Sequence, residues 1–197
     1  FETGRFRRNV SAITDFVAGG SAVEHIRNAG DQREYDGKID YKRPLGEAAS
    51  LNLGYEVDVG LSEFDFSGER GETLQSMLPV PALTNSFDYD QTVHALFGTY
   101  QFKTGKLDVQ SGLRVEQVYS TIDQITDDVR FDNDYFRIYP TLHLNYELPT
   151  GQQLRASYSR RIQRPSPLDL NPYTFYIDPL NVRRGNPFLE PEVTDSF

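Results

Sequence analysis

Hydrophobic and polar residues alternate strictly from Leu51 to Leu61. Odd positions hold Leu, Tyr or Val, and the even positions between them hold Asn, Gly, Glu or Asp. Because successive side chains of a strand point to opposite faces, this pattern predicts a strand with one apolar and one polar face. The pattern continues to Phe66, a reach of about 17 residues, whereas an average soluble strand has about 5–6. Strands of membrane barrels need about 9–11 residues to cross the hydrocarbon, so this length favours a barrel.

The same alternation runs through 35–41, 107–115, 138–148 and 154–158, which are therefore predicted to be further strands. Segment 87–102 is also predicted to be a strand, although apolar residues occur there on both parities. Val93, Ala95 and Phe97 share one parity, and the other holds further apolar residues: Leu96, Tyr100 and Phe102.

Connections between these strands alternate in length. Short turns are predicted near residues 45, 105 and 150, and long loops over 67–86, 121–133 and 164–187. Hairpins that end alternately in short turns and long loops are typical of outer-membrane barrels. Residues 1–30 are expected to be an irregular loop with a partial strand near 9–17. Residues 31–197 are expected to form an all-β antiparallel meander of long strands, part of a large transmembrane β-barrel.

Composition excludes several other classes. The chain has 13 Phe, 12 Tyr and no Trp, and such aromatic-rich chains favour sheets. No run of about 18 apolar residues is present, so no transmembrane helix is predicted. The net charge of −9 comes without a basic stripe, so no nucleic-acid partner is expected. Cysteine is absent, which excludes a disulfide framework and a thiolate nucleophile within this chain.

Three blocks of sequence resemble the barrel of TonB-dependent outer-membrane receptors, in the branch described as the outer-membrane protein β-barrel family. The first block covers 87–100 and the Gly-Leu-Arg-Val-Glu of 112–116, and the second is Asp-Tyr-Phe-Arg-Ile-Tyr-Pro-Thr-Leu at 134–142. The third and most specific block has three parts: Ser-Tyr-Ser-Arg-Arg-Ile-Gln-Arg-Pro-Ser at 157–166, Asp-Leu-Asn-Pro at 169–172 and Gly-Asn-Pro-Phe-Leu-Glu-Pro-Glu at 185–192. The resemblance covers residues 35–197 and is strongest from residue 87 on.

This resemblance implies import of a scarce solute, such as a siderophore or a glycan, across the outer membrane of a Gram-negative bacterium. The implied partners are outer-membrane lipid, the ligand, and the TonB complex, which acts through a plug that these residues do not contain. Such receptors close their barrels with about 22 strands, more than this sequence can supply. The chain is therefore expected to be a barrel fragment, an open curved sheet whose free edges could self-associate.

The polar parity is expected to line the interior of the barrel, where water and salt bridges satisfy charged groups. Eleven side chains follow from the alternation: Asn52, Glu56, Asp58, Gln110, Arg114, Glu116, His143, Asn145, Glu147, Arg155 and Arg161. Arg160 falls on the lipid parity instead, so either the strand has left the membrane there or a bulge intervenes.

Ligand contacts are expected in the last long loop and the basic run before it. Arginine combined with aromatic side chains is typical of surfaces that grip an anionic or sugar ligand. The candidate residues are Arg161, Arg164, Tyr173, Phe175, Tyr176, Arg183 and Arg184. The alternative for the same residues is a structural role, in which they pair with wall carboxylates or pack the loop onto the barrel mouth.

No catalytic, metal or cofactor site is expected. The aspartates of 123–134 match no calcium-loop spacing, and the three histidines lie in separate segments. No serine elbow, phosphate-binding loop or metalloprotease motif occurs, so the chain is predicted not to be an enzyme.

Two other interpretations remain open. One is a soluble β-sandwich that binds carbohydrate, which requires two apolar faces packed together within one chain. The other is a structural or adhesive barrel that transports nothing. The barrel interpretation requires Leu51, Leu53, Leu142 and Leu144 to lie on one uncovered apolar band, bordered by tyrosines such as Tyr41, Tyr100 and Tyr146.

Overall fold

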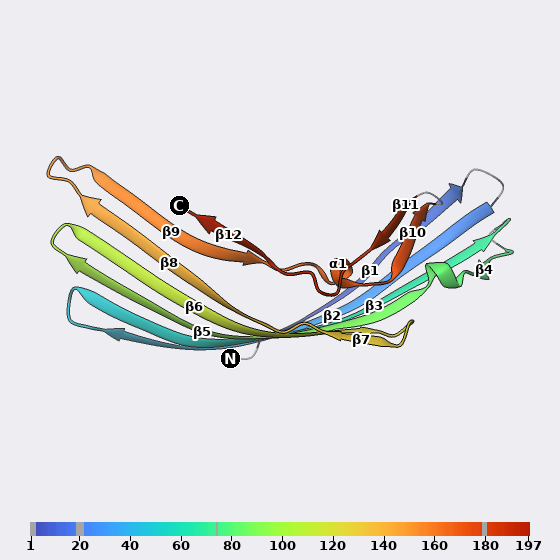
Figure 1. The fold of residues 1–197 in the computed structure, drawn as a ribbon, viewed down its shortest axis with the longest axis horizontal. Helices are drawn as coiled ribbons and strands as arrows, with labels where there is room; N and C mark the ends of the chain where they lie inside the picture. Colours follow the sequence, from blue (N-terminus) through green and yellow to red (C-terminus); the bar gives the residue numbers. More distant parts are fainter. Residues whose placement is uncertain (1–2, 19–21, 74, 179–180) are drawn as a thin grey trace.

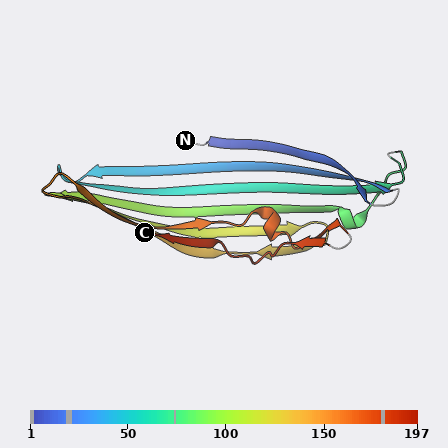
Figure 2. The same ribbon diagram turned by 90° about the horizontal axis from the view of Figure 1, so that it is seen from above.

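One long, curved antiparallel sheet makes up most of the molecule (Figure 1; Figure 2). The computed structural model describes residues 3–18, 22–73, 75–178 and 181–197, with side chains described from residue 25 on, except at 74 and 176–180. Its strands are β1 (Thr3–Ala18), β2 (Ala22–Pro44), β3 (Ala49–Gly71), β4 (Leu78–Pro79), β5 (Asn85–Thr104), β6 (Leu107–Gln124), β7 (Val129–Asp132), β8 (Tyr135–Glu147), β9 (Gln153–Gln163), β10 (Thr174–Asp178), β11 (Asn181–Arg184) and β12 (Glu192–Ser196). Two short helices complete it, η1 (Pro81–Leu83) and α1 (Pro167–Leu170).

The main sheet is a meander in the order β1-β2-β3-β5-β6-β8-β9-β12, with β4 beside β3 and β7 beside β6. Strands β10 and β11 form a separate hairpin. Short turns join β2 to β3, β5 to β6 and β8 to β9 at one end of the sheet, and the longer connections gather at the other (Figure 1). Gly105 and Gly151 adopt positive φ in two of these turns, which glycine does without steric cost. This architecture confirms the predicted all-β antiparallel meander.

The strands are longer than their hydrophobic patterns. Strands β2 and β3 have 23 residues each, and β3 reaches well into the segment expected to be a loop over 67–86. Strand β6 likewise extends to Gln124, and β7 pairs with it inside the segment expected to be a loop over 121–133. Residues 3–18 form β1 and residues 22–30 the first part of β2, where an irregular loop with a partial strand was expected.

Register places the apolar positions of neighbouring strands side by side on one face. Ile39, Tyr55, Leu96, Val115 and Ile138 form one continuous row across five strands. No second sheet packs on this face in the described part of the chain, and Leu53 is 45% exposed there. A sandwich would bury these side chains, so the sheet is built as a barrel wall.

The mixed pattern of β5 is resolved by the same register. Leu96 and Tyr100 lie on the outward apolar face, whereas Val93, Ala95 and Phe97 lie on the opposite, inner face. The inner side chains are apolar because they are covered: Val93 is 4% exposed and Ala95 is fully buried. Phe97 lies flat over Gly54, where an added Cβ would be only 2.2 Å from the ring.

A small hydrophobic core lies on the inner face, toward the end with the longer connections. Its buried members come from three segments far apart in sequence: Phe87 and Tyr89 on β5, Ile122 on β6 and Leu170 in α1. Phe64, Phe66 and Phe131 pack around them. The connection between β9 and β12 therefore folds back onto the inner face of the sheet (Figure 1).

Candidate functional site on the inner face

The inner face carries the polar side chains of the wall. All eleven residues that the alternation assigned to the barrel interior share this face, as the strand register shows. Residues 164–191, called the strap here, connect β9 to β12, and their described part lies over the same face. The site is thus formed by the wall and the strap together.

An ionic network joins three wall strands to the strap. Arg114 on β6 donates to Glu116 Oε1 at 2.6 Å, and its two terminal nitrogens each donate to Glu56 on β3 at 3.3 Å. Lys38 on β2 lies 3.9 Å from Glu56. Glu116 is 4% exposed, and its second oxygen accepts from Arg164, at the start of the strap. Hydrogen-bonded pairs of this kind satisfy charges that the wall and strap would otherwise leave buried and unpaired.

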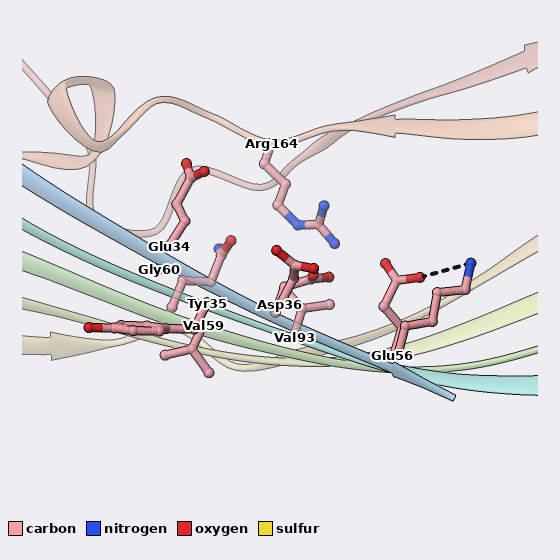
Figure 3. A pocket seen from close by; sticks show the side chains of 11 residues that line it. Glu34, Tyr35, Asp36, Glu56, Val59, Gly60, Val93 and Arg164 are labelled. Atoms are coloured by element: carbon pink, nitrogen blue, oxygen red, sulfur yellow. Dashed lines mark ion pairs between the residues drawn. The ribbon is translucent and has the colours of Figure 1, made fainter. Parts of the chain in front are cut away.

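A hollow of about 640 Å³ lies beside this network, between β2, β3, β5 and the strap (Figure 3). Glu34, Asp36 and Glu56 lie on the same side of the sheet, and Arg164 extends toward them from the strap. Tyr35 and Val59 border the hollow with their backbone only, since their side chains point to the other side of the strands (Figure 3). Carboxylates outnumber cations along its walls, so it favours groups that donate hydrogen bonds.

A ring of three amide side chains fixes the middle of the strap. Asn85 donates to Gln124 at 2.8 Å, Gln124 donates to Asn171 at 2.7 Å, and Asn171 donates back to Asn85 at 2.8 Å. All three residues are fully buried. The sequence does not reveal this site, because Asn85 and Gln124 lie in segments expected to be loops, where no strand parity assigns them to a face. The only signal in the sequence was Asn171, which belongs to the Asp-Leu-Asn-Pro block.

The candidate ligand residues occupy different environments. Arg161 is exposed on the inner face, whereas Arg164 is bound to Glu116. Tyr173 donates to the carbonyl of Pro81, and Phe175 packs edge-on against Phe66 at 5.0 Å.

Within the strap, two candidate arginines bind strap groups. Arg183 donates to Asp169 at 2.7 Å, and Arg184 donates to the carbonyl of Pro172 at 2.8 Å. The side chain of Tyr176 lies outside the described residues. The structure thus brings these candidates to one region, with most of their polar groups already engaged.

Arg160 lies on the outward face, as its parity requires. No register shift separates β9 from β8 or from β12, so a bulge does not explain its position. Its guanidinium instead makes two hydrogen bonds to Asp195, at 2.8 and 2.9 Å, and the Tyr158 hydroxyl donates to the same carboxylate. The outward charge is therefore matched by a bidentate partner.

The described residues contain no group of three or more His, Cys, Asp or Glu side chains arranged to hold a metal ion. Among the aspartates of 123–134, Asp132 accepts hydrogen bonds from Thr121 and Arg130. Among the same residues, no helix is long and apolar enough to span a membrane.

Comparisons with known proteins agree with this architecture. The model of the outer membrane protein beta-barrel family matches residues 6–197. The crystal structure of the unliganded ferric citrate transporter FecA is similar in fold, with a TM-score of 0.54 and 13% sequence identity over 82% of this chain. The match spans 24% of that structure's chain. A search of curated proteins gives no match. With its apolar outward face and polar inner face, the chain belongs to the outer membrane protein β-barrel family and is located in the outer membrane of a Gram-negative bacterium.

Proposed function

We propose that this chain forms part of the wall and extracellular loops of a TonB-dependent receptor that imports a scarce solute, such as a siderophore or a glycan. The observation that carries the proposal is the contrast between the two faces of one sheet. The outward face presents uncovered apolar rows, and the inner face carries an ionic network and a docked strap. A wall of this kind separates hydrocarbon from a wide, wet interior.

The TonB-dependent part of the proposal rests on the sequence blocks at 157–166, 169–172 and 185–192. It is supported by the similarity in fold to the ferric citrate transporter FecA. In such a receptor a plug fills the barrel, and TonB acts through the plug. The inner ionic network would then face the plug, and the outward rows would face outer-membrane lipid.

The ligand would bind to the strap and to the inner wall next to it. The candidates are those expected from the sequence: Arg161, Arg164, Tyr173, Phe175, Tyr176, Arg183 and Arg184. Arg161 has its guanidinium available on the exposed inner face, and we expect it to contribute most to binding an anionic ligand. The chain supplies binding surface and no chemistry, so we propose that it is not an enzyme and needs no cofactor.

Isolated from the rest of a barrel, the sheet would have free edges. The meander runs from β1 to β12 without pairing these two strands in the described residues. Unpaired strand edges are templates for association, so we propose that the chain alone self-associates through them.

Uptake by whole cells tests this function. Cells with and without the full-length protein would be given radiolabelled ferric siderophores and oligosaccharides, before and after a protonophore discharges the inner membrane. Active import predicts protein-dependent uptake that the protonophore abolishes. Uptake that persists in the presence of the protonophore would indicate a passive pore. No uptake of any substrate would favour a structural or adhesive barrel.

A further inference from the structure

The strap is attached to the wall at several points between its start and its end. Near its start Arg164 donates to Glu116, and near its end Arg137 on β8 donates to Glu190 at 3.1 Å. Between these points, Leu170 is 3% exposed in the core against β5 and β6. The side chain of Asn133 also donates to the carbonyl of Pro187. A loop that extended freely from the barrel mouth would share none of these contacts.

The amide ring gives this attachment a defined position. Each of its three side chains donates one hydrogen bond and accepts one within the ring. Asn171 Oδ1 also accepts from the backbone N–H of Tyr173 at 3.0 Å. A buried polar network in which every amide oxygen and nitrogen has a partner favours one arrangement, because a shift would break several buried hydrogen bonds at once.

The strap also holds its own shape. The backbone N–H of Gly185 donates to the carbonyl of Asn171, and that of Asn186 donates to the carbonyl of Asp169, both at 2.8 Å. A Cβ on Gly185 would lie 2.5 Å from both of these carbonyl oxygens. The outgoing and returning halves of the strap are thus closed against each other, where only glycine fits.

We propose that the strap is a fixed part of the inner wall that stays docked during transport, and that it presents its ligand-facing side chains pre-organised. The transport half of this proposal rests on the function proposed above. The docking half concerns this chain alone. Its physical basis is the combination of a satisfied buried ring, a shared hydrophobic core and ion pairs near both ends. Pre-organised contacts bind with less loss of conformational entropy than contacts on a mobile loop.

Cross-linking tests whether the strap must move. In the full-length receptor, Arg137→Cys and Glu190→Cys would be combined and joined by a short, cleavable thiol-reactive linker. The matched control joins Lys103→Cys to Asp108→Cys, which face each other across β5 and β6. We expect both cross-linked receptors to import labelled substrate within twofold of their uncross-linked forms.

The two proposals fail in different ways. If the parent receptor imports no substrate, the proposed function fails and the cross-link is uninformative about transport. If the parent imports substrate but the Arg137–Glu190 cross-link alone lowers import tenfold or more, and cleaving the linker restores it, the strap moves and the proposal is overturned.

Proteolysis tests docking without any transport. Arg183 and Arg184 are exposed trypsin sites on β11, but cleavage requires this part of the strap to open locally from its pairing with β10. We expect the parent receptor to resist cleavage there and Asn171→Ala to be cleaved about tenfold faster or more. Asn145→Ala is the matched control, since Asn145 lies on the inner face of β8 near the short turn, beside Asp108 on β6 and Arg155 on β9. Rapid cleavage of the parent, or equal rates in parent and Asn171→Ala, would refute a docked strap.

Discussion

Gln124 at the end of β6 donates a 2.7 Å hydrogen bond to Asn171 in the strap, although the two residues are far apart in sequence. Asn85 completes the ring from the beginning of β5. The three side chains connect both strands of one hairpin to the segment that crosses it. The position of the strap is therefore determined by polar groups at strand ends, beyond the part of each strand that faces lipid.

Gln124→Ala should destabilise the barrel. The substitution removes two buried hydrogen bonds, one from the side-chain nitrogen of Asn85 and one to Asn171 Oδ1, so that each atom keeps a single partner, Thr126 or the backbone N–H of Tyr173. The loss of two such hydrogen bonds costs about 1–3 kcal/mol in total. The free energy of unfolding of the full-length protein in detergent, measured by urea titration, should fall by about that amount. Gln110→Ala removes the same side chain from an exposed inner position and should change stability by less than about 0.5 kcal/mol. Equal effects of the two changes would contradict the role of the ring.

Glu116 and Arg164 should be energetically coupled. Glu116→Gln removes the carboxylate that two guanidiniums share, and breaking a buried pair costs about 3–5 kcal/mol. Both arginine side chains are 29% exposed, so water compensates in part for the lost carboxylate. We therefore expect Glu116→Gln to lower the free energy of unfolding by about 1–3 kcal/mol. A double-mutant cycle with Arg164→Gln should give a coupling energy above about 0.5 kcal/mol.

The matched control for this cycle is the exposed pair of Arg130 and Asp132. Their side chains are 63% and 61% exposed, and such surface pairs contribute little. Asp132→Asn should therefore change the free energy of unfolding by less than about 0.5 kcal/mol. A Glu116–Arg164 coupling energy no larger than this would mean that the ion pair does not hold the strap.

Gly185→Ala should disrupt the closure of the strap. The added methyl group would meet the carbonyl oxygens of Asp169 and Asn171 at 2.5 Å, and these backbone atoms cannot rotate away. Overpacking of this kind costs about 1–3 kcal/mol. Gly60→Ala is the matched control, because nothing lies within 4 Å of a Cβ at that position. Thermal unfolding in detergent should separate the two variants, and equal melting temperatures would argue against the close approach.

Acid should loosen the strap through Asp169. The hydrogen bond from Ser166 and the guanidinium of Arg183 lower the pKa of the Asp169 carboxyl below its ordinary value. A carboxyl with a lowered folded pKa stabilises the fold above its unfolded pKa, about 3.9, and this contribution is lost as pH falls through the folded pKa. The protection factors of backbone amides in 166–178 and 181–186, which compare hydrogen exchange with its intrinsic rate at each pH, should therefore stay high at neutral pH and fall below about pH 4. Asp169→Asn should remove this acid response, and an unchanged response would exclude Asp169 as its source.

The alternation of side chains was enough to predict the wall. Leu51 to Leu61 and Leu142 to Leu148 define a face because lipid selects every second residue, and that signal lies within each strand. Beyond the lipid this selection ends, so Asn85 and Gln124 could not be recognised as strand residues. The fold of the strap depends on contacts between Asn171, Gly185 and the ends of β5 and β6, which alternation does not encode.

The outward face should meet the edge of the hydrocarbon between two defined rows. The apolar row through Tyr55 crosses β2, β3, β5, β6 and β8. Further toward the long loops, a second row crosses β2, β3, β5, β6 and β7 and carries a charged residue on each strand: Asp31, Glu63, Asp88, Asp123 and Arg130. Leu53→Arg would place a charge within the apolar band and should cost about 2–4 kcal/mol, whereas Glu63→Arg in the charged row should cost about 0–1 kcal/mol. Folding the full-length protein into lipid vesicles from urea measures both values. Similar costs at the two positions would mean that Leu53 does not face lipid, and the assignment of this face to the membrane would be wrong.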